Sequence, residues 1–129
     1  MELSPKDAES LFNKSLLLIK IEKYSLAEKD LLKTIEILTK YKSPFAKNLY
    51  NIYYNLGLCQ NNQSKYKEAI ESLTSSISLY KNFADSYYQI ALAFKELKQY
   101  ENALSELNKV IILEPNYLEA YYLKGKILL

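Results

Sequence analysis

The chain has 129 residues with 17 basic and 15 acidic side chains, and this near-balance, a formal net charge of +2, argues against nucleic acid or an anionic membrane as its partner. Histidine is absent and Cys59 is the single cysteine, so an internal disulfide is excluded and neither a metal site nor an oxidising compartment is indicated. Only two glycines and three prolines are available for tight turns, which favours long helices over strands joined by hairpins.

Apolar residues recur at three- and four-residue spacing along most of the chain, which is the pattern of amphipathic helices. The pair Ser4-Pro5 is typical of a helix start, because serine caps the first N–H groups and proline has no N–H to lose in the first turn. Ser43-Pro44 repeats this signal. We expect helices over residues 4–22, 25–41, 44–61, 66–80, 83–97 and 100–113, and a last helix from 116 onward.

Much of the sequence repeats with a period of thirty-four residues. At this spacing, Tyr53, Tyr54, Leu58, Tyr66, Ala69, Leu73, Ile77 and Leu79 fall on Tyr87, Tyr88, Leu92, Tyr100, Ala103, Leu107, Ile111 and Leu113. An earlier copy, containing Tyr24 and Ala27, is offset by forty-two residues. We expect the eight extra residues to lengthen the second and third helices by about one turn each. A fixed period of this length predicts helical hairpins stacked into a solenoid.

The residues within each period resemble the tetratricopeptide repeat family. The best copy supplies the aromatic, small and apolar positions of the family pattern, namely Tyr87, Ile90, Ala91, Phe94, Tyr100, Ala103, Leu107, Val110 and Pro115. The copy before it departs from the pattern with Gln60 in place of an aromatic residue and Lys81 in place of proline. The resemblance implies an all-α, right-handed α-solenoid of antiparallel hairpins with about seven helices. It further implies a single domain over residues 1–129, with repeats at about 8–41, 50–83 and 84–117 and a terminal helix at 118–129.

Small residues are predicted where the two helices of each hairpin cross most closely. The three pairs are Ser15 with Ala27, Gly57 with Ala69, and Ala91 with Ala103. A larger side chain at such a crossing would overpack it.

No arrangement of residues predicts catalysis, a cofactor or a metal. Cys59 has no imidazole partner and follows Leu58 in a predicted helix, so we interpret it as a buried structural thiol. Acidic residues are expected on solvent faces, without the spacing of a cation site or a catalytic carboxylate pair. The apolar run from Ser15 to Ile21 is interrupted by Lys20 and is neither a signal peptide nor a membrane span. We expect a non-enzymatic, cytoplasmic protein without a membrane partner.

The resemblance also implies where a ligand would bind, because in this family the first helices of successive repeats line a concave groove that holds a peptide. The matching positions, our candidate peptide-binding residues, are Phe12, Asn13, Leu16, Tyr54, Asn55, Leu58, Tyr88, Gln89, Leu92 and Tyr122. Rings and leucines suit the apolar side chains of an extended peptide, and amides can pair with its backbone. These ten residues are here called the ladder. The alternative is that the ladder is the ordinary surface of the fold and binds no ligand.

Two ligand classes fit the groove poorly. Co-chaperones of the family grip the C-terminal carboxylate of heat-shock proteins through lysines, an arginine and asparagines. Asn55 matches one of those asparagines, but the matching cationic positions hold Phe12, Asp85 and Gln89, so this carboxylate clamp is not supported. Single-stranded RNA would need a basic groove, whereas the same face is expected to carry Glu9, Asp85 and Glu119 as well as Lys20 and Lys95.

The predicted function is therefore binding of a peptide segment of a partner protein in the concave groove. The alternative is an assembly or scaffold role, in which the chain docks or forms a homo-oligomer through its ends or its convex face. Ile127, Leu128 and Leu129 favour this second interpretation, because terminal repeats normally need a polar outer face. A third alternative is that the chain is the repeat fragment of a larger protein.

Overall fold

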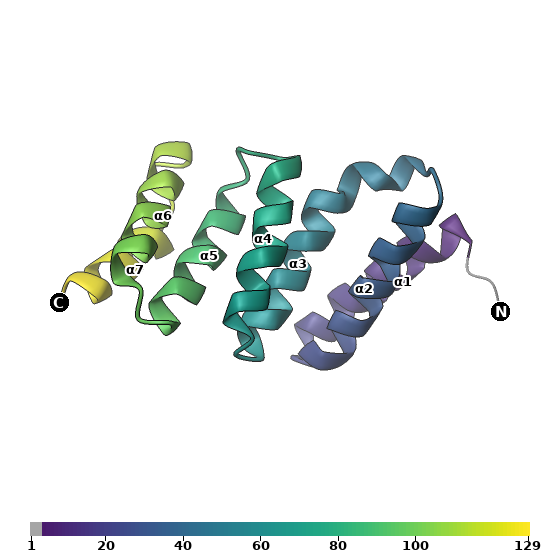
Figure 1. The fold of residues 1–129 in the computed structure, drawn as a ribbon, viewed down its shortest axis with the longest axis horizontal. Helices are drawn as coiled ribbons and strands as arrows, with labels where there is room; N and C mark the ends of the chain where they lie inside the picture. Colours follow the sequence, from purple (N-terminus) through teal and green to yellow (C-terminus); the bar gives the residue numbers. More distant parts are fainter. Residues whose placement is uncertain (1–3) are drawn as a thin grey trace.

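Figure 1 shows the computed structural model, which describes residues 4–129 as a row of helices stacked from one end of the chain to the other. The elements are α1 (Pro5–Lys20), α2 (Tyr24–Lys40), the 3-10 helix η1 (Pro44–Asn48), α3 (Leu49–Asn62), α4 (Tyr66–Leu79), α5 (Ala84–Glu96), α6 (Tyr100–Leu113) and α7 (Leu118–Leu128). Every regular element within residues 4–129 is helical. The predicted all-α solenoid is confirmed.

The helices form three hairpins and a terminal helix. α1 packs on α2, α3 on α4 and α5 on α6, and each hairpin then packs on the next along the chain. α1 also contacts α3, and α3 contacts α5, more extensively than α2, α4 and α6 contact one another. The helices α1, α3 and α5 are therefore the more closely spaced layer, and the surface that they form is here called the inner face.

Each hairpin is closed by the same tight turn. Glu22, Ser64 and Lys98 have left-handed backbone angles, with φ of 61°, 63° and 62°. The following residue donates its backbone N–H to a carbonyl five positions earlier, as Gln99 does to Phe94 at 2.9 Å. This is the Schellman ending of a helix, in which glycine usually takes the left-handed position. The same turn geometry therefore joins the two helices of each of the three hairpins.

The extra residues of the first repeat are distributed differently from the expectation. α2 has 17 residues against 14 in both α4 and α6, so the added turn on the second helix is confirmed. The predicted start of the third helix at Pro44 is wrong, because Pro44–Asn48 forms a separate 3-10 helix and α3 begins at Leu49. Ser43 Oγ accepts the N–H of Phe45 at 3.2 Å, and the Phe45 ring packs edge-on against Phe12. The serine-proline signal therefore starts a short helix that is anchored by an aromatic contact.

The six small residues predicted at the hairpin crossings are all buried: Ser15 and Ala27, Gly57 and Ala69, Ala91 and Ala103. Gly57 is closely packed against Leu73 of α4, because a Cβ atom there would overlap Leu73 Cγ and lie 2.7 Å from Leu73 Cδ2. Leu73 is itself fully buried. Cys59 is buried as predicted, and its burial together with the charge of Glu28 raises its pKa to about 12.

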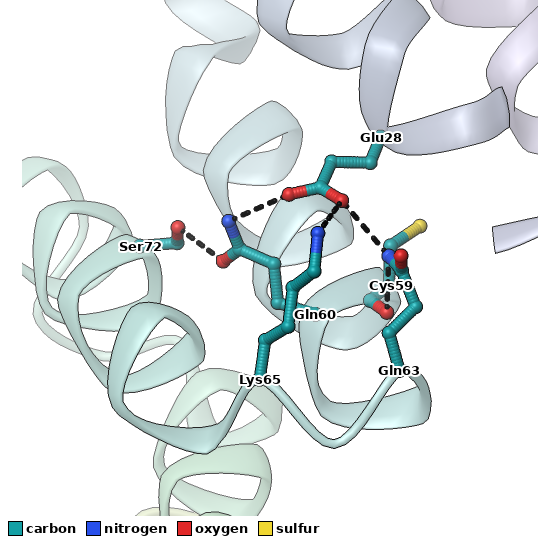
Figure 2. A network of polar contacts seen from close by, with 6 residues as sticks. All are labelled: Glu28, Cys59, Gln60, Gln63, Lys65 and Ser72. Atoms are coloured by element: carbon teal, nitrogen blue, oxygen red, sulfur yellow. Dashed lines mark hydrogen bonds and ion pairs between the residues drawn. The ribbon is translucent and has the colours of Figure 1, made fainter. Parts of the chain in front are cut away.

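A buried polar network joins the first hairpin to the second (Figure 2). Glu28 on α2 is only 8% exposed, which contradicts the expectation that acidic residues lie on solvent faces. Its carboxylate accepts from Gln60 Nε2 (3.1 Å), Gln63 Nε2 (2.9 Å) and Lys65 Nζ (3.0 Å), and Ser72 Oγ donates to Gln60 Oε1 (2.6 Å). Burial alone would raise the pKa of Glu28, but the three donors outweigh burial and hold this pKa below its ordinary value. At position 60, where the repeat pattern has an aromatic residue, Gln60 therefore makes polar contacts to Glu28 and Ser72.

Candidate functional site

The candidate peptide-binding residues lie on α1, α3, α5 and α7, and their exposure differs widely. Phe12 and Asn55 are buried; Tyr54, Leu58, Tyr88, Gln89 and Leu92 are half-buried; Asn13, Leu16 and Tyr122 are exposed. The half-buried group on α3 and α5 is the part of the ladder that combines a fixed position with access to solvent.

Two of the ten candidates are buried and make their contacts within the protein itself. Phe12 is buried in the core of the first hairpin, where its ring lies 5.9 Å from that of Phe45. Asn55 is also buried, and its Nδ2 donates to the Asn51 backbone carbonyl at 2.8 Å. Its N–H group is therefore already used within α3.

The tyrosines of the ladder pair with rings from the ends of repeats. Tyr54 meets Phe83 edge-on with 5.1 Å between ring centroids, and Tyr88 lies 5.3 Å from Tyr117. The Tyr117 hydroxyl donates to Asp85 Oδ1 at 2.6 Å. Burial, followed by the nearby Asp85 carboxylate, raises the pKa of Tyr54 to about 12. These phenols therefore stay protonated at physiological pH and can donate hydrogen bonds.

A pocket of about 540 Å³ opens where α1, α3 and α5 come together near the hairpin turns, and it is here called the inner-face pocket. It brings together the candidates Leu58, Gln89 and Leu92, and adds Ile19, Tyr24, Asn61, Asn62, Tyr66 and Glu96. Asn61 Nδ2 donates to both the backbone carbonyl and the Oε1 atom of Gln89, at 2.9 and 3.0 Å. This contact fixes α3 against α5 at the wall of the pocket.

Sequence reasoning does not single out the six added residues as binding residues. Asn61 and Asn62 belong to a polar cluster that predicts the end of a helix, which conceals their place on the inner face. Helical spacing carries the missing signal, because Asn61 follows Leu58 by three residues and Glu96 follows Leu92 by four. The stripe of groove positions therefore continues to the last turn of each first helix.

The three remaining candidates lie outside the inner-face pocket: Asn13 and Leu16 are exposed on α1, and Tyr122 lies on the terminal helix α7. Tyr122 is 71% exposed, and Lys126 Nζ lies 5.4 Å from the centre of its ring. Within residues 4–129, no group of three or more histidine, cysteine, aspartate or glutamate side chains is placed to hold a metal ion. Over the same described range, no helix has the length and apolar character needed to cross a membrane.

Three hairpins, closed by equivalent turns and sharing a hollowed inner face, define a helical-repeat protein. The family model for the tetratricopeptide repeat matches residues 50–83 and 84–117, more than half of the chain. The chain belongs to the tetratricopeptide repeat family. No curated protein matches its sequence.

Solved structures share this architecture over nearly the whole chain. MamA is 23% identical, with 95% of this chain and 67% of MamA covered at a TM-score of 0.83. The TPR domain of Arabidopsis OM64 is 16% identical, with 95% and 94% covered at 0.85. The first TPR of Spaghetti (RPAP3), solved with the HSP90 peptide SRMEEVD, is 20% identical, with 98% and 94% covered at 0.83. At these identities the likeness shows a common fold.

Proposed function

We propose that this protein is a non-catalytic interaction module that binds an extended segment of a partner protein along its inner face. The inner-face pocket carries the proposal, since half-buried Leu58 and Leu92 form apolar walls beside the amide of Gln89. Apolar concavities with a few placed polar groups are the usual form of a ligand site. Two structures of the same fold support a peptide ligand: RPAP3 with its HSP90 peptide, and YrrB, a TPR protein with an unusual peptide-binding site.

A C-terminal carboxylate is not the ligand that we propose. Asp85 stands at one of the positions where the clamp would need a cation, and its carboxylate is fixed there by the Tyr117 hydroxyl at 2.6 Å. A second carboxylate brought to this position would be repelled. We place the binding event in the cytoplasm, where the reduced state of Cys59 would be maintained.

The test uses an immobilised library of short random peptides and three variants of the full chain. Leu58→Ala and Leu92→Ala remove apolar contacts from the inner-face pocket, while Ile112→Ala removes a 78% exposed apolar side chain from α6. Each groove variant should weaken binding about tenfold, as expected for the loss of a contact at the centre of an interface. Ile112→Ala should bind like wild type. Equal affinity in all three variants, with unchanged circular dichroism, would contradict a groove on the inner face.

A second candidate function is assembly through α7, and one observation favours it. Gly125 occupies the position that Gly57 has in α3, yet a Cβ atom at Gly125 would meet nothing within 4 Å, whereas Gly57 packs under Leu73. Leu118 on the same helix is 74% exposed. The face of α7 that contains Gly125 is therefore exposed, whereas the equivalent face of α3 packs on α4. We propose that a second copy of the chain packs on this exposed face of α7.

Sedimentation equilibrium at rising protein concentration tests this second candidate. The wild type should exceed the mass of a monomer, and Leu128→Lys on α7 should return it to the monomeric mass. Leu17→Lys, at an exposed leucine of α1, is the matched control and should leave the assembly intact. A monomeric wild type over the whole concentration range would refute assembly through α7.

A further inference from the structure

The geometry points to a specific role for the inner-face pocket: it receives a lysine or arginine side chain of the bound peptide. This inference rests on the proposed peptide-binding function and names the class of ligand. The pocket lies within the usual size range of ligand sites, about 300–1,000 Å³. At about 540 Å³ it has room for a long side chain together with part of the peptide backbone.

Charge is the first argument. Among the described residues, the walls of the inner-face pocket hold one charged side chain, Glu96. Lys95 lies nearby, with 3.8 Å between its Nζ and Glu96 Oε1, but an exposed pair of this length contributes little. Lys65, on the turn after α3, is bound to Glu28 at 3.0 Å. The Glu96 carboxylate is therefore available to a cation that arrives with a ligand.

The acceptors inside the pocket supply the second argument. Asn61 Nδ2 donates to two oxygen atoms of Gln89, which fixes the orientation of the Asn61 amide group. Asn61 Oδ1 is buried, and no donor in residues 4–129 reaches it. Buried acceptors are nearly always paired, so this oxygen is an acceptor at the pocket wall that the described part of the chain leaves unused. A cationic side chain carries several N–H donors and no acceptor.

The apolar walls supply the third argument. Ile19 of α1, Leu58 of α3 and Leu92 of α5 approach the pocket from three helices. Lysine and arginine bury an aliphatic stem against such walls while the charged head reaches a polar rim. A leucine in this pocket would bring no cation to the Glu96 carboxylate, and a glutamate would be repelled by it. A basic side chain suits both the apolar walls and the Glu96 carboxylate.

The experiment starts from the peptides that the wild-type chain selects from the immobilised random library, and these should be enriched in lysine or arginine. The strongest binder is then synthesised in three forms, with its basic residue kept, exchanged between lysine and arginine, or replaced by norleucine. Each form is titrated against wild type, Glu96→Gln and the control Glu71→Gln. Glu71 is exposed on α4 outside the pocket, so this control removes the same charge elsewhere.

Glu96→Gln should weaken binding of the basic peptide about two- to fivefold, the size of a partly exposed charge pair. The loss should vanish for the norleucine peptide, and Glu71→Gln should have no effect on either. A library without basic enrichment, or an equal response of the basic and norleucine peptides to Glu96→Gln, would overturn the inference while leaving peptide binding through Leu58 and Leu92 intact. If the wild type selects no peptide at all, both the inference and the proposed function fail.

Discussion

Gln60 on α3 donates its side-chain N–H to Glu28 on α2, with 3.1 Å between Nε2 and Oε2, although the two residues are thirty-two positions apart. The pair stands at the junction of the first and second hairpins, where Lys65 and Ser72 complete the network (Figure 2). Because Glu28 is almost fully buried, its carboxylate loses hydration, and the hydrogen bonds from its donors must offset this desolvation cost.

Glu28→Gln should lower the free energy of unfolding by about 1–3 kcal/mol, because a single amide oxygen cannot serve the donors of Gln60, Gln63 and Lys65 together. Urea denaturation followed by circular dichroism measures the change. Glu36→Gln, at an exposed position on the same helix, is the matched control and should stay within about 0.5 kcal/mol of wild type. Equal stability of the two variants would contradict a stabilising network.

The same network makes stability depend on pH. The donors hold the pKa of Glu28 below its ordinary value, so its contribution is complete above the unfolded-state pKa and is lost as pH falls through the folded-state value. The stability difference between wild type and Glu28→Gln should therefore be constant near neutral pH and should narrow below about pH 4.3, the ordinary value for glutamate. Urea titrations at a series of acidic pH values provide the measurement. A difference that stays constant through this range would show that Glu28 titrates normally.

The two glycines should respond to alanine in opposite directions. Gly57→Ala forces a Cβ atom into Leu73 at a closed crossing and should cost about 1–3 kcal/mol. Gly125→Ala meets open space within a helix and should stabilise the chain by about 0.5–1 kcal/mol, the usual advantage of alanine over glycine. Thermal unfolding of both variants compares them directly. A cost for Gly125→Ala similar to that of Gly57→Ala would mean that α7 is already covered in solution.

Lys98→Gly should stabilise the third hairpin turn. Lys98 has a φ of 62°, and a left-handed conformation costs a residue with a Cβ roughly 1–2 kcal/mol. Glycine removes this strain but loses more conformational entropy on folding, so the expected net gain is about 0.5–1 kcal/mol. Lys33→Gly, at an exposed position inside α2, should instead cost about 1 kcal/mol. A destabilised Lys98→Gly variant would contradict the turn geometry.

The local spacing of apolar residues predicts the helices, but it does not predict contacts between residues that are far apart in the sequence. The predicted helix over 100–113 coincides with α6, because the spacing of Ala103, Leu107 and Val110 is a property of consecutive residues. The burial of Glu28 depends on donors thirty-two to thirty-seven positions away, which no local pattern contains. The inner-face pocket is likewise assembled from five separate helices, α1 to α5, so the sequence predicts only its α3 and α5 leucines and Gln89.

The ring pairs at the repeat ends have a mechanical consequence. Phe83 and Tyr117 close two successive repeats, and each packs against a tyrosine of the proposed groove, Tyr54 and Tyr88. The joints that set the angle between neighbouring hairpins are therefore built from the same rings that a ligand would touch. A peptide segment that contacted Tyr54 or Tyr88 would therefore also touch the ring pairs through which neighbouring repeats pack on one another.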